Sequence, residues 1–124
     1  MTNICICGGG NLGHVVAGFL AARSDVEVSL LTRHPDRWAN ELSVDTPDGT
    51  VLHGPLRRVS ADASDVVPQA DLVILCLPGF SIASVLQAVR PFLKPSAAIG
   101  TVVSNTGFFF EAQRLLPEAT CRFG

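Results

Sequence analysis

Three glycines near the start of the sequence have the spacing of a phosphate-binding turn. Gly8, Gly10 and Gly13 follow a short apolar run at residues 3–7 and open a segment with helical spacing of its apolar residues. Gly8 permits the sharp turn from strand to helix, a side chain at Gly10 would occupy the space of a pyrophosphate, and Gly13 lets the helix lie close to the strand. The free amides at the helix start can then bind phosphates without a basic side chain.

The context of these glycines, after a strand and before a helix, predicts a dinucleotide site. The alternative is a glycine-rich turn without a ligand. The other residues of the turn that we expect to contact the cofactor are Gly9, Asn11 and Leu12. His14 lies in the first helical turn, where it could touch a phosphate or the substrate, or could simply cap or pack.

The end of the second predicted strand, residues 26–32, bears on the choice of cofactor. NAD sites usually carry Asp or Glu there to hold the ribose hydroxyls, but this chain has Thr32 and Arg33. A guanidinium would attract a 2′-phosphate, so Arg33 favours NADP(H) over NAD. Thr32 and Asp36 could still serve a ribose, which keeps NAD open, and Arg33 could also be a solvated loop residue.

Two later loops also follow predicted strands and are expected to face the cofactor. The first contains Leu77, Pro78 and Gly79, and the second begins at Ser104. Ligands of open α/β sheets bind at the carboxyl ends of the strands. We therefore expect the first loop beside the ribose and pyrophosphate and the second near the nicotinamide. Ordinary turn chemistry is the alternative for both.

Strands that alternate with helices predict an α/β fold of the Rossmann type, doubly wound, with a mainly parallel sheet and helices on both faces. The predicted strands are residues 3–7, 26–32, 71–79, 97–104 and 119–124, and the predicted helices are residues 12–22, 81–93 and 107–117. Residues 42–56 are expected to form a hairpin, and residues 61–70 a short helix or a loop. Ser81 is expected to cap its helix and Pro91 to end it, and Pro35 suits a helix start.

The composition is that of one globular domain without a strongly basic surface. The 124 residues are 48% hydrophobic and 16% charged, with a net charge of −2. This balance argues against nucleic acid and anionic lipid as partners. No apolar stretch approaches the roughly 18 residues of a membrane span, and no signal peptide is evident. The expected location is cytoplasmic, where the four cysteines would be buried free thiols; they are Cys5, Cys7, Cys76 and Cys121.

The sequence contains no convincing catalytic constellation. No Ser-His-Asp order and no metal-ligand spacing is present, and His34 and His53 are expected to be surface residues. In a nicotinamide enzyme the hydride belongs to the cofactor, while the protein supplies binding and orientation. We therefore predict no catalytic residue and no metal within the chain, and expect a second domain to close the nicotinamide side.

Four segments together resemble the amino-terminal domain of the octopine (opine) dehydrogenases. They are CICGGGNLGHVVAGFLAAR, VEVSLLTRHPDRW, ADLVILCLPGFS and SNTGFFFEAQRLLP. Glycerol-3-phosphate dehydrogenase and ketopantoate reductase belong to the wider similar group. The resemblance implies that NAD(P)H reduces an imine of an amino acid and a 2-keto acid, and that a second, helical domain supplies the catalytic His and most contacts to the small-molecule substrate.

The resemblance also implies that residues 1–124 are the dinucleotide-binding domain of a longer enzyme, since the chain ends at Gly124. Arg33 departs from the NADH preference of octopine-type members. Three alternatives stay open. One is a ketopantoate reductase-like or glycerol-3-phosphate dehydrogenase-like domain, another is a non-enzymatic NAD(P)-binding regulatory module, and the third is a degenerate dimer scaffold. In a homodimer the apolar residues 108–110 could form the interface, although they are equally explained as core.

Overall fold

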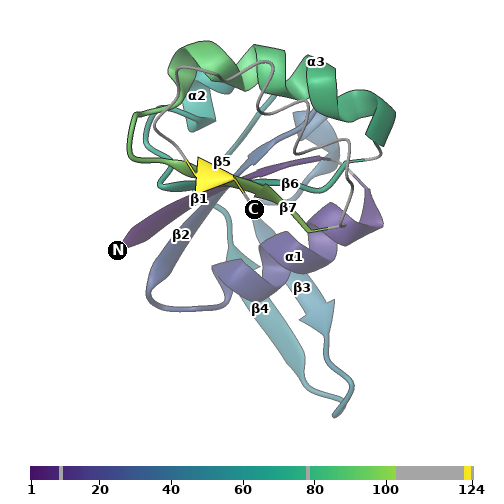
Figure 1. Cartoon of the computed structure of the whole chain (residues 1–124). Helices are drawn as coiled ribbons and strands as arrows, with labels where there is room; N and C mark the ends of the chain where they lie inside the picture. The colour runs from purple at the N-terminus through teal and green to yellow at the C-terminus, as the bar shows by residue number, and fades with distance from the viewer. Residues whose placement is uncertain (9, 78, 103–121, 124) are drawn as a thin grey trace.

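A six-stranded parallel sheet forms the centre of the molecule (Figure 1). The computed structural model of the chain describes residues 1–8, 10–77, 79–102 and 122–123. The strand order is β5-β2-β1-β6-β7-β8. The strands are β1 (Thr2–Cys7), β2 (Val26–Leu31), β5 (Arg58–Ser60), β6 (Leu72–Leu75), β7 (Ala98–Thr101) and β8 (Arg122–Phe123). Because all pairs are parallel, the carboxyl ends of the strands meet at one edge, where such sheets bind ligands.

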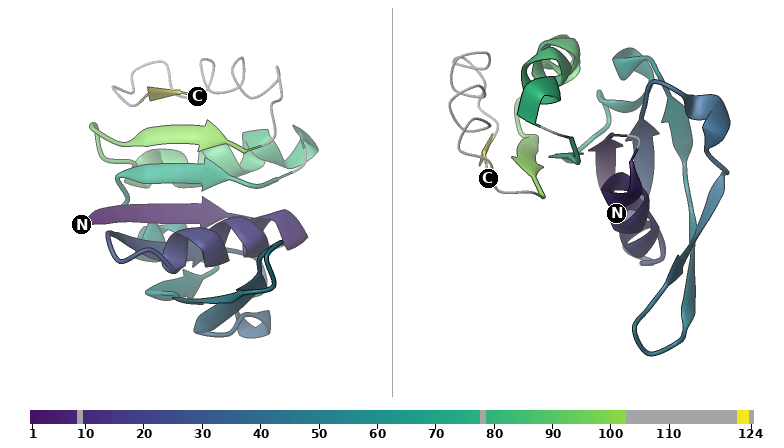
Figure 2. Two further views of the ribbon diagram at one scale, coloured as in Figure 1. Left: turned by 90° about the horizontal axis from the view of Figure 1, so that it is seen from below. Right: turned by 90° about the vertical axis from the view of Figure 1, so that its right-hand side faces the viewer.

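Helices cover both faces of this sheet (Figure 2). Helix α1 (Asn11–Ala21) lies on one face, and α2 (Ala63–Val66) and α3 (Gly79–Val89) lie on the other. Two short 3-10 turns, η1 (Pro35–Arg37) and η2 (Arg90–Phe92), follow β2 and α3. The arrangement confirms the predicted doubly wound α/β fold. It follows from right-handed crossovers that leave the centre of the sheet in opposite directions.

The core is divided into two layers by the alternation of side chains along β1. Cys5 and Cys7 pack under α2 and α3, whereas Ile4 and Ile6 pack under α1. A strand covered on both faces reads as a continuous apolar run, as this segment does. Cys5, Cys7 and Cys76 are buried free thiols, as predicted, and Cys121 lies outside the described residues.

A separate antiparallel hairpin, β3 (Glu41–Asp45) and β4 (Val51–Pro55), packs against α1 and extends away from the sheet (Figure 1). The predicted hairpin over residues 42–56 is thus confirmed. Thr46 and Thr50 close its tip around Asp48, and Gly49 takes a φ of +89°. The hairpin extends the layer that α1 forms on its face of the sheet.

Several element boundaries differ from those expected. Helix α3 begins at Gly79, so Ser81 lies within its first turn and does not cap it, and β6 ends at Leu75, well short of residue 79. The edge strand β5 was not predicted. Residues 61–70 contain the four-residue helix α2, whose cap is Asp62. The predicted helix 107–117 and the apolar residues 108–110 lie outside the described residues.

Candidate functional site

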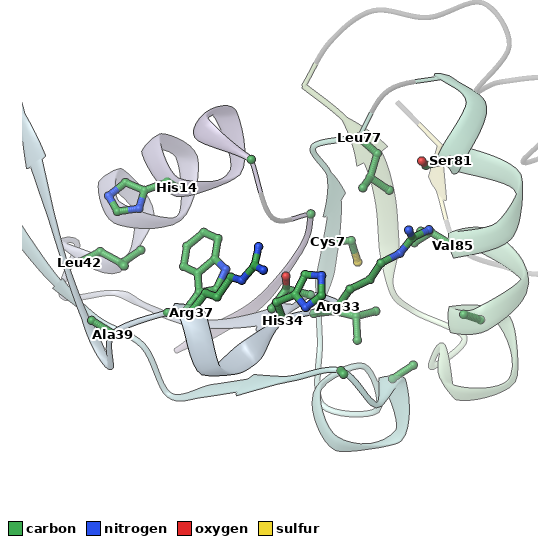
Figure 3. A pocket seen from close by; sticks show the side chains of 18 of the residues that line it. Cys7, His14, Arg33, His34, Arg37, Ala39, Leu42, Leu77, Ser81 and Val85 are labelled. Atoms are coloured by element: carbon green, nitrogen blue, oxygen red, sulfur yellow. The ribbon is translucent and has the colours of Figure 1, made fainter.

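A cavity of about 970 Å³ opens at the carboxyl edge of the sheet (Figure 3). Its floor is formed where β1 and β2 end, by Cys7, Gly8 and Leu31. The start of α1 and the hairpin form one wall, and α3 forms the other. This position is the crevice in which open α/β sheets bind ligands.

Two glycines of the turn, Gly8 and Gly10, line this cavity. Gly8 has a φ of +147°, a conformation that side chains disfavour, and its N–H donates to the carbonyl of Leu31 at 3.0 Å. Gly10 is the N-terminal cap of α1, and a Cβ built there would have no described atom within 4 Å. The residues described in α1 provide no side-chain cap and no acidic group in the first turn. The amides at the helix start are therefore available to an anion.

Basic side chains gather in the loop that follows β2. Arg33, His34 and Arg37 are exposed and line the cavity, while Thr32 is buried and its N–H donates to the carbonyl of Ser60 at 2.9 Å. Within the part of the chain that the structure describes, neither arginine side chain forms an ion pair or a hydrogen bond. Glu41 is the acidic residue of the described cavity wall, and its Oε1 lies 3.6 Å from Nδ1 of His53 on the hairpin.

His14 joins the start of α1 to the hairpin. Its Nε2 lies 3.3 Å from the carbonyl oxygen of Ser43, which can only accept, so Nε2 carries the proton in this contact. The imidazole also lies against Trp38, with ring centroids 5.6 Å apart and planes tilted by 31°. The side chain thus packs within the wall of the cavity, in line with the packing alternative for this residue.

The opposite wall is small and largely apolar. Ser81, Val85 and Ala88 recur along one face of α3, and Ala61 and Ala63 come from the loop and helix after β5. A wall of small side chains leaves a slot for a flat ring. Ser81 belongs to the loop that was expected beside the cofactor. The sequence reasoning missed Val85, Ala88, Ala61 and Ala63, although the spacing of residues 81, 85 and 88 on a helix that follows a buried strand was a usable signal.

Cys7 at the floor is not poised as a nucleophile. Hydrogen bonding with Cys5, burial, and the neighbouring thiols raise the pKa of Cys7 well above its ordinary value. The thiol therefore stays protonated at neutral pH. The described residues contain no group of three or more His, Cys, Asp and Glu side chains that could hold a metal ion, and none of their helices is long and apolar enough to cross a membrane.

The residues predicted to bind a cofactor fall into three groups. Those that line the cavity together are Gly8, Gly10, Thr32, Arg33 and Leu77. Those at helix starts are Asn11, Leu12, Gly13 and Gly79. Gly9, Pro78 and Ser104 lie outside the described residues. Of the second group, Leu12 is 39% exposed and Gly13 is buried, and neither is among the described residues of the cavity wall.

Known dehydrogenases share both the sequence and the fold of this chain. The opine dehydrogenase of Haliotis discus hannai is 32% identical over 130 residues, which are 93% of this chain and 32% of the relative. The octopine dehydrogenase of Pecten maximus is 34% identical over 125 residues, which are 91% of this chain and 31% of the relative. The chain therefore spans about a third of the length of these relatives.

Solved structures of related dehydrogenases share the fold of this chain. An octopine dehydrogenase in complex with NADH and agmatine has a TM-score of 0.91 and 32% identity, covering 99% of this chain and 34% of that one. A ketopantoate reductase of Ralstonia eutropha has a TM-score of 0.72 and 25% identity, over 98% of this chain and 40% of that one. The sequence model of ketopantoate reductase PanE/ApbA matches residues 4–106, a range that begins within β1 and extends past β7. With most of its length matched, the chain belongs to the ketopantoate reductase PanE/ApbA family.

Proposed function

We propose that the chain is the dinucleotide-binding part of an NAD(P)-dependent oxidoreductase of the opine dehydrogenase type. The observation that carries the proposal is the open space over Gly10, where a Cβ would meet nothing within 4 Å, next to the uncapped start of α1. A pyrophosphate bound in that space would accept hydrogen bonds from the free amides at the helix start. The relative solved with NADH shares the fold of 99% of this chain.

The cofactor that we propose is NADP(H), with NAD(H) as the weaker ligand. Thr32 stands where a ribose-binding carboxylate would repel a 2′-phosphate, and Arg33 follows it with its guanidinium free of any described partner. A free guanidinium at this position can form charge-assisted hydrogen bonds to a phosphate. The related octopine dehydrogenase was solved with NADH, so this preference would distinguish the chain from that relative.

The proposed reaction is reduction of an imine formed between an amino acid and a 2-keto acid. Octopine dehydrogenase has been solved with NADH and L-arginine and with NADH and pyruvate. The nicotinamide supplies the hydride when it is bound. The described residues of this chain hold and orient the dinucleotide. Among them, Cys7 is a protonated thiol and His14 is packed in the wall, so neither forms an acid–base pair at the cavity floor. Further residues, outside those described, would bind the substrate and protonate the nitrogen.

The test is a calorimetric titration of the protein with NADH and NADPH side by side. We expect NADPH to bind at least as tightly as NADH. Gly10→Val should fold normally and weaken both ligands at least about tenfold, since its side chain fills the pyrophosphate space. Arg33→Ala should weaken NADPH selectively, while Arg90→Ala, at an exposed arginine outside the cavity, should change neither.

Two results would count against the proposal. If neither cofactor binds at millimolar concentration, the dinucleotide site is wrong. If Arg33→Ala weakens both cofactors equally, the site stands and the NADP(H) preference is wrong.

The family model supports ketopantoate reduction as a second candidate reaction. The two candidates share the cofactor site and differ in the substrate. NADPH consumption with ketopantoate alone, against consumption with a 2-keto acid and an amino acid together, separates them in any longer protein that contains this chain. We favour the second outcome, because opine dehydrogenases are 32% to 34% identical to this chain.

A further inference from the structure

We propose that Arg37 is a second residue that binds the 2′-phosphate, on the side of the cavity opposite to Arg33. The inference rests on the proposed function, because it assigns a specificity residue to the same cofactor site. The sequence pattern pointed to Arg33, which lies two residues after the end of β2. Arg37 comes four residues later, in the 3-10 turn η1, and its place in the cavity depends on how that turn folds.

The backbone of η1 holds Arg37 in place. The N–H of Arg37 donates to the carbonyl of His34 at 3.0 Å, and the N–H of Trp38 donates to the carbonyl of Pro35 at 3.2 Å. Pro35 sits at the first position of the turn, where its fixed φ suits the helix start. The turn brings the chain back over the end of β2, so that Arg33 and Arg37 both line one cavity.

The two guanidinium groups reach different parts of that cavity (Figure 3). Arg33 extends toward Val85 on α3, across the small apolar wall. Arg37 lies on the side of His14 and Leu42, where α1 and the hairpin form the wall. The two side chains therefore approach the cavity from different sides, and a phosphate bound between them would have a guanidinium on each side.

The charges favour the same assignment. Arg23 and Arg57 are neutralised by ion pairs with Asp25 and Glu27, each at 3.0 Å. Arg33 and Arg37 have no such described partner and face the same cavity. Two uncompensated cations in a chain of net charge −2 make a local site for an anion with more than one charge. A ribose 2′-phosphate is the part of the proposed cofactor that fits this site.

Trp38 and His14 shape the surface beside Arg37. The indole is half-buried and lies against the imidazole in a tilted arrangement, and the Nε2 of that imidazole contacts the hairpin carbonyl of Ser43. These contacts link the segment that carries Arg37 to α1 and to the hairpin. Arg37 is exposed, and the described contacts of the fold do not depend on its side chain.

The experiment uses two mononucleotides that differ by the phosphate in question. 2′,5′-ADP and 5′-AMP are titrated calorimetrically into the wild-type protein and into Arg37→Gln, with Arg90→Gln as the matched control. We expect Arg37→Gln to weaken 2′,5′-ADP by about tenfold or more, as loss of a charge-assisted hydrogen bond does, and to leave 5′-AMP within about twofold. Arg90→Gln should leave both ligands unchanged. The conservative variant Arg37→Lys should fall between wild type and Arg37→Gln for 2′,5′-ADP.

The outcomes separate the two proposals. If Arg37→Gln binds 2′,5′-ADP as tightly as the wild type, the assignment of Arg37 is overturned while the cofactor site stands. The same holds if Arg37→Gln weakens both nucleotides equally. If the wild-type protein binds neither nucleotide and neither NADH nor NADPH, both proposals fail. Thermal melts show whether each variant is folded. If Arg37→Gln folds poorly, Arg37→Lys provides the test of the side chain instead.

Discussion

The carbonyl oxygen of Cys76 lies where a side chain at Gly8 would begin. A Cβ built on Gly8 would be 2.5 Å from that oxygen and 3.3 Å from the carbonyl carbon. The N–H of Cys76 in turn donates to the carbonyl of Cys7 at 2.8 Å, so the chain just after β6 is locked against the end of β1. The turn that carries the glycines is therefore packed against the neighbouring strand, and its shape depends on both segments.

Replacing Gly8 by alanine should destabilise the fold and remove dinucleotide binding together. The positive φ of +147° alone costs about 1–3 kcal/mol for a residue with a side chain, and the contact with a backbone oxygen adds to this. Urea denaturation of Gly8→Ala should show this loss, with Gly10→Ala as the control. Gly10 has a φ of −94° and open space for a Cβ, so its stability should stay within about 0.5 kcal/mol of wild type. Equal stability of Gly8→Ala and wild type would contradict the role of this contact.

The third glycine should behave differently. A Cβ on Gly13 would lie 3.7 Å from the Cβ of Cys76 and 3.8 Å from the carbonyl carbon of Gly8, which are ordinary van der Waals distances. One methyl group therefore fits, and Gly13→Ala should raise the free energy of unfolding by up to about 1 kcal/mol through helix propensity. Gly13→Leu should lower it, since the buried site has room for no more. Urea titrations of both variants and the wild type measure these differences. A destabilised Gly13→Ala would show that the site has no room for a methyl group.

The parallel sheet was predictable because its central strands are covered on both faces. Residues 3–7 and 71–79 are apolar without alternation, which signals such strands at once. The edge strand β5 gives no such signal. It is three residues long, it pairs on one side only, and only Val59 packs against the core. β5 belongs to the sheet because it pairs with β2, and this long-range pairing cannot be predicted from the local sequence pattern.

The candidate site also contains residues that the sequence predicts and residues that it does not. The glycine turn and Arg33 are local features, so their spacing along the chain indicates them. Arg37, Val85 and Ala61 reach the cavity from three separate elements, and their meeting depends on how η1 folds and where α3 lies. That these residues meet at one cavity is a property of the tertiary structure, and it cannot be predicted from a single sequence.

The tip of the hairpin should show a low titration midpoint. Hydrogen bonds from the hydroxyls of Thr46 and Thr50 and from the N–H of Thr50 lower the pKa of Asp48 from the ordinary 3.8 to about 2. A carboxylate with a lowered pKa adds stability that is fully present above the unfolded value and is lost as pH falls from about 4 through 2. The amide resonance of Thr50 should therefore titrate with a midpoint near 2 and should not titrate there in Asp48→Asn. A midpoint near 4 would show that these contacts do not hold in solution.

Gly54 should be as intolerant of a side chain as Gly8, for a different reason. A Cβ on Gly54 would lie 2.7 Å from the Cβ of Ala21 and 2.8 Å from the carbonyl oxygen of Gly18, so β4 touches the backbone of α1 directly. Gly54→Ala should lower the free energy of unfolding by about 1–3 kcal/mol, because neither helix backbone nor strand can give way cheaply. His53→Ala, an exposed neighbour on the same strand, should change it by no more than about 0.5 kcal/mol.

Displacement of the hairpin by Gly54→Ala should also reach the cofactor cavity. The hairpin carries the Ser43 carbonyl that contacts His14, and the His14 ring lies against Trp38, the single tryptophan of the chain. We therefore expect the Trp38 emission of folded Gly54→Ala to shift to the red and its quenching by iodide to increase, since the indole loses part of its cover. His53→Ala should leave the emission as in wild type. Unchanged Trp38 emission in a destabilised Gly54→Ala would mean that the hairpin moves without the cavity wall, and that His14 does not transmit the displacement.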